Sequence, residues 1–383
     1  MSEKQQQTIA REMPGLSLPA FVDNLDPNHV TGWYSSVDAT LGFKSASFSL
    51  YGNKNYLEDW FFNGLGRQIT RYAPDGQFTI WDGFVNSMTL YEPGLRSIIT
   101  LDGLANSVQA QYASMDTTTN PPTTTILPTL TAAGTDTDSI ARYGTHSEIV
   151  NAGQVPATLA TQIRDQQLQR LAWPQPDDTA DSEQKDLRLD FQCRGWGYSL
   201  AWRIYNQTTN SGAQNANVEV SDILTLVGQF IATSVFATNA TQIPKYHQDS
   251  QRALDLILAI LAVGDSSNNR WIAPVLEART LYYRQARTSV DYYRRIADNS
   301  LAVYEKSGRK LPPWEVRPDH WLRLTDLYPF KANDPVLLQS DPQVKYVEEV
   351  IYSEPYGLQL LGAQRNRLAA LQAAQSLLGV RVT

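Results

Sequence analysis

Cysteine is nearly absent from this 383-residue sequence, in which Cys193 is the only one. One cysteine excludes an intramolecular disulfide and a metal site built from cysteine ligands. Long apolar runs are also missing. The longest, residues 253–263, contains Asp255, so we expect no membrane-spanning helix. Residues 1–11 are polar and lack the apolar stretch of a signal peptide, so we expect folding in a cytoplasm.

Charge is sparse and biased toward acid. Charged residues make up 19% of the chain, and 39 acidic residues against 32 basic ones give a net charge of -7. No run of Lys and Arg is present, which argues against a surface that grips DNA phosphates. The balance is compatible with a channel through which DNA passes, where mild repulsion prevents sticking.

Surface polarity must therefore come from Gln, Asn, Ser and Thr. Uncharged polar groups are cheaper to bury than ions, so such a surface suits permanent contacts between subunits; compositional drift is the alternative explanation. A hydrophobic content of 42% is enough for folded cores, and the length predicts two or three subdomains.

The histidines show no metal-binding pattern. None of the four has a second histidine one helical turn away, so we expect ordinary surface or hydrogen-bonded roles and no metal or cofactor. They are His29, His146, His247 and His320.

One short block resembles the nucleophile block of some serine esterases, namely residues 264–266 (Gly-Asp-Ser), with Asp319 and His320 downstream. Because this block follows a helical pattern, we predict a helix end and a turn instead. The neighbouring carboxylates at 58–59 and 348–349 should point apart and lie on solvated faces. We therefore predict no catalytic residue and no enzymatic activity.

The chain divides into five predicted segments. These are an N-terminal arm (1–32), a first β module (33–112), a linker-rich, partly helical insert (113–186), a second β module with inserted helices (187–357) and a C-terminal helical tail (358–383).

Local patterns place the elements within these segments. Alternation of apolar and polar residues predicts strands at 45–50 and 187–193, and aromatic residues favour another at 198–205. A loop is expected at 114–138 and a polar linker at 177–185. Helices are expected at 156–173, after a cap at Ser221, and after a cap at Asp249.

Nine tryptophans are the most unusual feature of the composition. Exposed aromatic rings bind sugars or anchor interfaces, whereas buried ones fill cores. We predict core packing for most of them.

Several blocks, taken in order, resemble a family of phage tail proteins related to the baseplate hub and tail-tip hub. They are 41–50 (LGFKSASFSL), 59–67 (DWFFNGLGR), 81–86 (WDGFVN), 139–144 (SIARYG) with 160–174 after it, 193–203 (CRGWGYSLAWR), 263–271 (VGDSSNNRW) and 313–318 (PWEVRP). The N-terminal arm and the Leu- and Ala-rich C-terminal tail depart from this pattern.

The resemblance implies a fold and a function. The fold would be β-rich α+β, with two antiparallel β-barrel-like tube modules and helical insertions. Three chains would form a ring that adapts a sixfold tail tube to a threefold tip and encloses the DNA channel. The implied partners are further copies in a homotrimer, a tail-tube or distal-tail protein, a tip, spike or tape-measure protein, and DNA that passes without sequence-specific binding. The expected location is the virion tail tip.

Two other functions stay open at this stage. One is a distal-tail adaptor, which would form a hexamer one layer up the tail. The other is a tail-tip protein that binds or cleaves glycans. The symmetry of the assembly separates the first two, and polysaccharide binding identifies the third.

Overall fold

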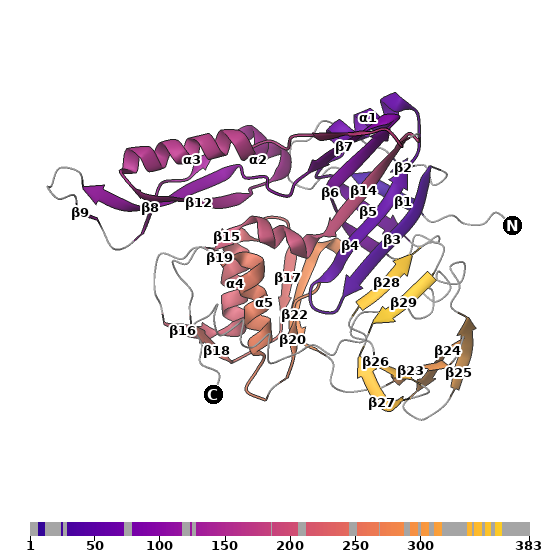
Figure 1. Cartoon of the computed structure of the whole chain (residues 1–383). Helices are drawn as coiled ribbons and strands as arrows, with labels where there is room; N and C mark the ends of the chain where they lie inside the picture. The colour runs from indigo at the N-terminus through magenta and orange to yellow at the C-terminus, as the bar shows by residue number, and fades with distance from the viewer. Residues whose placement is uncertain are drawn as a thin grey trace.

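The computed structural model of the chain shows a β-rich body, a projecting arm, and two packed helices beside the body (Figure 1). It describes residues 7–11, 24–25, 29–72, 79–116, 123–124, 128–184, 186–205, 212–244, 251–267, 269–286, 292–297, 300–305, 310–315, 335–338, 341–346, 349–353 and 357–361.

Three strands form the centre of the body. β14 (Arg188–Gly195) lies antiparallel between β4 (Gly42–Leu50) and β6 (Thr79–Glu92). Alternate residues of β14 are buried, as the alternation in its sequence predicts. The division into domains remains a prediction, but this strand, assigned to the second module, lies between two strands of the first.

The central strands belong to a fifteen-stranded sheet that is not closed into a barrel. The β-rich class is thus confirmed, and the two barrel-like modules stay a proposal. The other strands are β3 (Val30–Asp38), β28 (Glu349–Ser353) and β29 (Gly357–Leu361) beyond β4; β5 (Gln68–Tyr72), β1 (Gln7–Arg11), β2 (Asn24–Leu25), β7 (Gly94–Thr100) and β13 (Asp177–Asp181) beyond β6; and β21 (Val275–Leu276), β22 (Thr280–Gln285), β20 (Trp271–Ile272) and β17 (Thr233–Phe236).

A glycine allows the chain to pass close to a neighbouring strand at the end of β14. A Cβ atom added at Gly195 would lie 1.7 Å from the carbonyl oxygen of Phe43. That oxygen belongs to the backbone and cannot move without disturbing β4. Any larger residue at position 195 would therefore push the two strands apart.

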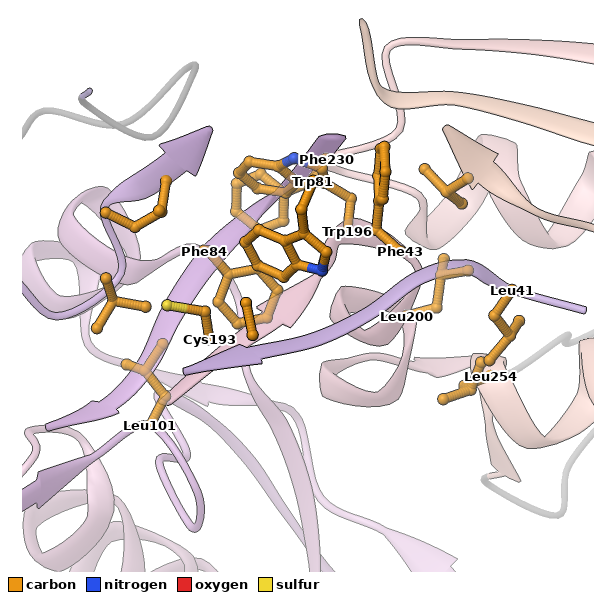
Figure 2. Packing of buried hydrophobic residues seen from close by; sticks show 14 of the residues in the cluster. Leu41, Phe43, Trp81, Phe84, Leu101, Cys193, Trp196, Leu200, Phe230 and Leu254 are labelled. Carbon is orange, nitrogen blue, oxygen red and sulfur yellow. The ribbon is translucent and has the colours of Figure 1, made fainter. Parts of the chain in front are cut away.

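Aromatic side chains fill the core beneath the sheet. Figure 2 shows Trp81, Phe84, Trp196 and Phe230 packed together, with Cys193 beside them. Core packing of the tryptophans is confirmed for five that have at most 5% of their surface exposed, namely Trp33, Trp60, Trp81, Trp196 and Trp271.

The chain leaves β14 in a 3₁₀ helix, η1 (Trp196–Trp202), where the aromatic pattern predicted a strand. The prediction is wrong for residues 198–202, because tertiary contacts outweigh the β propensity of the aromatic residues, and holds only for residues 204 and 205, which form a short strand. The Trp196 indole donates a hydrogen bond to the buried Asp82, and Leu200 packs into the core.

Two apolar helices, α4 (Ala216–Val227) and α5 (Ala253–Val263), pack against each other beside η1. The predicted cap at Ser221 is wrong, since Asn215 is the N-cap of α4 and Ser221 lies inside the helix. The predicted cap at Asp249 is also wrong, since α5 begins at Ala253 with Arg252 as its N-cap; Asp249 itself lies outside the described residues. The predicted end of α5 at Gly264 is confirmed.

Residues 107–171, which take in the end of the predicted first module and most of the insert, form the arm that Figure 1 shows projecting from the body. β8 (Ser107–Asp116) pairs in parallel with β12 (Ser147–Val155), and the helix α3 (Ala157–Leu171) packs on β8. Shorter elements complete it: β9 (Thr123–Thr124), β10 (Thr129–Leu130), β11 (Gly134–Thr135) and α2 (Thr137–Tyr143). The helix predicted at 156–173 is confirmed, whereas the predicted loop at 114–138 contains strands.

Three predictions at segment ends differ from the structure. β13 occupies the expected polar linker and pairs with β7. β1 lies in the segment predicted to be an N-terminal arm (1–32), and it pairs with β5 of its own chain. β29 is a strand where the C-terminal helix was expected to begin, and the rest of that helix lies outside the described residues.

The remaining strands form small sheets: β15 (Ile204–Tyr205) with β19 (Gln251–Arg252), β16 (Ala213–Asn215) with β18 (Gln242–Pro244), and β23 (Tyr292–Ala297), β24 (Ser300–Glu305), β25 (Lys310–Glu315), β26 (Pro335–Leu338) and β27 (Asp341–Tyr346) together. Among the described residues, no helix has both the length and the apolar character that a membrane crossing requires.

Candidate assembly surfaces

The esterase-like block forms the end of a helix, as predicted. Gly264 ends α5 at a φ of 75°. Asp265 accepts hydrogen bonds from the backbone amide of Asn269 and from the Trp271 indole, at 2.9 and 3.0 Å. The pKa of the Asp265 carboxyl is lowered overall. Burial acts to raise this pKa, but the hydrogen bonds to the charged form together have the larger effect. Ser266 is exposed, and Asp319 and His320 lie outside the described residues.

The neighbouring carboxylates bind different partners. Glu58 lies 3.6 Å from Lys54, while Asp59 accepts a hydrogen bond from Asn63. Glu349 pairs with Lys44 at 3.0 Å and so ties β28 to β4. These contacts are structural, and position 348 lies outside the described residues.

The two described histidines differ in environment. His29 is exposed, whereas His146 is buried and stacks on Trp202 with ring centroids 4.2 Å apart. Burial lowers the pKa of His146 to about 3. His247 and His320 lie outside the described residues. Among the residues that the structure describes, no group of three or more His, Cys, Asp or Glu side chains could hold a metal ion.

Asp82 is the most enclosed carboxylate of the sheet. It accepts hydrogen bonds from Gln68, Thr70 and Trp196 at 2.7–2.9 Å. Burial raises its pKa even though these bonds favour the charged form. The group orients η1 beneath the sheet, and none of these three partners is a titratable base.

A buried asparagine holds the base of the arm. The Asn106 side chain is 0% exposed and donates hydrogen bonds to Ser139 Oγ at 3.1 Å and to the Gly144 carbonyl at 2.8 Å. Its Oδ1 accepts from the His146 amide at 2.8 Å. One side chain thus fixes the starts of β8 and β12 and the helix α2, a role that no sequence pattern indicated.

An arginine ties the arm to the helical pair. Arg252, at the start of α5, donates to Glu148 at 2.7 Å and to the carbonyl oxygens of Ser147 and Ala201 at 3.2 and 2.9 Å. The Arg252 guanidinium thereby joins β12 to η1. The arm is fixed at its base by these contacts and by Asn106.

Beyond its base, the arm buries little of its surface. Ala160 is the only buried residue of the fifteen in α3. Leu159 is 42% exposed, and Trp173, just after α3, is 36% exposed. Helices usually gain most of their stability by packing an apolar face, so this helix suits contact with another molecule.

The sheet ends in open edges. Of its described strands with four or more residues, β13, β17 and β29 each pair with one neighbour only. Unpaired edge groups form hydrogen bonds readily with a strand of another molecule. The edges and the arm are therefore the candidate assembly surfaces.

Neither the known family models nor the curated proteins match this chain. Solved structures do. The 43 kDa tail protein of prophage MuSo2 from Shewanella oneidensis is 8% identical, with 95% of this chain and 99% of that chain covered and a TM-score of 0.45. The tail protein from Neisseria meningitidis is 9% identical, with 96% and 99% covered and a TM-score of 0.41.

A third similar structure comes from Escherichia coli and is described as a component of the type VI secretion system that resembles T4 bacteriophage tail proteins. It is 10% identical, with 92% of this chain and 74% of that chain covered and a TM-score of 0.37. In structure, this chain is thus similar to phage and prophage tail proteins, the family that its sequence resembles.

Proposed function

We propose that the chain is a structural subunit of a phage tail tip, a baseplate hub that adapts a sixfold tail tube to a threefold tip and encloses the DNA channel. The proposal starts from the ordered sequence blocks that resemble this family. The carrying observation is that a large unclosed sheet leaves open edges while an arm with little buried surface projects from it.

Both features suit permanent contacts with other subunits. An open edge is satisfied by a strand from a neighbour, and the exposed side of α3 is covered by another molecule. Three copies would complete two barrel-like modules each, which gives six similar positions facing the tube. Further partners in this arrangement are the tube or distal-tail protein, and the spike or tape-measure protein.

The charge of the chain is compatible with a passive channel. A net charge of -7 would suit a lumen in which DNA slides without binding. The candidate polar residues that the structure describes take part in helix ends, strand ties and the base of the arm. A purely structural role, without catalysis, fits these contacts.

Electron microscopy of the purified full-length chain, or of tails that contain it, tests the proposal through symmetry. A threefold ring with two β modules per chain facing a central channel is the expected result. A sixfold ring with one module per chain would replace the hub with the distal-tail adaptor. A monomer that binds cell-wall or surface polysaccharide would reject both.

A further inference from the structure

The three long open edges of the sheet differ in charge. β13 carries three aspartates in five residues, a device that discourages pairing with other strands. β17 (Thr-Ser-Val-Phe) carries none and lies within residues 223–244, a stretch without a charged residue. β29 (Gly-Leu-Gln-Leu-Leu) is likewise uncharged. One edge is therefore protected against pairing, and two are suited to it.

The two uncharged edges are the ends of one path through the sheet. From β17 the pairing runs through β22, β21, β4, β3 and β28 to β29. Figure 1 shows β28 and β29 on one side of the body and β17 on the side toward α4 and α5. Two different edges at opposite ends allow head-to-tail contacts, which form a ring when the rotation from one subunit to the next closes and an open filament when it does not.

The β17 edge is exposed and also held firmly in place. Val235 is 54% exposed. At one end of the strand the Ala232 amide donates to the carbonyl of Arg279 at 3.0 Å, and at the other the Ala237 amide donates to the carbonyl of Tyr283 at 2.8 Å. The Thr233 and Thr280 hydroxyls lie 2.8 Å apart and join β17 to β22.

The turn that supports this edge is strained. Ala278 and Arg279, which precede β22, have φ values of 55° and 56°, where residues other than glycine are disfavoured. Such conformations are strained and are found mostly at functional sites. Here the turn positions β22 and, through it, the open strand.

We propose that β17 of one copy pairs with β29 of a second copy, so that the sheets of neighbouring subunits become continuous around a head-to-tail ring. The proposal rests on the ring-forming function proposed above. It adds which two edges form the contact and which edge, β13, stays outside it.

Cross-linking of single-cysteine variants of the full-length chain tests this pairing. Ser234→Cys on β17 is mixed with Gln359→Cys on β29 and treated with a short bis-maleimide. A cross-linked dimer is expected in the mixture and not with either variant alone. Thr179→Cys on β13 is the matched control and should cross-link with neither. The native Cys193 is 2% exposed and should not react.

A charge on the edge provides a second measurement. Val235→Lys should weaken self-association by about tenfold or more, whereas Thr179→Lys should leave it unchanged. Both positions are exposed, so the fold should tolerate either lysine.

The outcomes separate this inference from the proposed function. A threefold ring without the 234–359 cross-link, or with strong 234–234 cross-linking, would overturn the edge pairing and leave the hub intact. Cross-linked open filaments or sixfold rings would support the pairing and reject the threefold hub. Monomers that do not cross-link would reject both.

Discussion

Replacing Asn106 with alanine should release the arm from the body. The change removes a fully buried amide that donates two hydrogen bonds and accepts a third. Each such bond contributes about 0.5–1.5 kcal/mol, and a buried group left without its partner costs about 1–3 kcal/mol. We therefore expect a loss of about 2–4 kcal/mol in the free energy that holds the arm folded.

Native-state hydrogen exchange measures this loss locally. Amides of β12 and α3 should exchange about 30-fold faster or more, since about 2 kcal/mol corresponds to that factor. Amides of β4 and β14 should change less, because Asn106 does not contact those strands through its side chain. Urea unfolding of the same variant gives the effect on the whole chain.

The arm supplies a matched control. Asn151 lies in β12, is exposed, and accepts one hydrogen bond from the Gly153 amide at 2.9 Å. Asn151→Ala should change stability by no more than about 0.5 kcal/mol. If Asn106→Ala were as mild as this control, the buried network would not hold the arm and the reasoning would be refuted.

Three further perturbations have defined outcomes. His146 binds a proton more readily in the unfolded chain than when buried. The free energy of unfolding should therefore fall as the pH is lowered from 6.5 to 3, by about 2 kcal/mol at pH 5. Urea unfolding at a series of pH values should show this fall in the native protein and not in His146→Gln. Gly195→Ala should prevent stable folding because the new Cβ would clash with the Phe43 carbonyl. Gly197→Ala is the control and should fold, because its Cβ would lie 3.3 Å from the nearest atom, the Leu41 carbonyl oxygen. Circular dichroism distinguishes the two results. Ala278→Gly should raise the melting temperature by relieving the positive φ, by about 1 kcal/mol in stability, and Ala278→Val should lower it; equal effects would exclude strain.

Periodicity predicted the local elements well and their neighbours poorly. The alternation in β4 and β14 is visible in the sequence because each strand buries one face. The placement of β14 between β4 and β6 is not visible, because pairing depends on residues about a hundred positions away. Residues 177–185 were predicted to be a linker but contain β13. This acidic strand resembles a loop in sequence, and its pairing partner β7 lies about eighty positions away.

The candidate surfaces were harder to predict than the fold. Helix ends at Gly264 and turns at Asp265 follow from local rules. Asn106 and Arg252 do not, since each acts through contacts made by segments distant in the sequence. A buried and an exposed tryptophan look alike in a sequence, so only the structure separates Trp196 from Trp173.

The place of β14 between β4 and β6 has a consequence for how the chain is made. Ribosomes add about 5–20 residues per second, so β4 and β6 wait several seconds for the strand that joins them. During this time the arm, whose contacts are local, can fold first. β28, which pairs with β3 from the far end of the chain, arrives later still. The newborn sheet is therefore exposed to wrong pairing for most of its synthesis, and slowing translation before residue 188 should increase aggregation of the nascent chain.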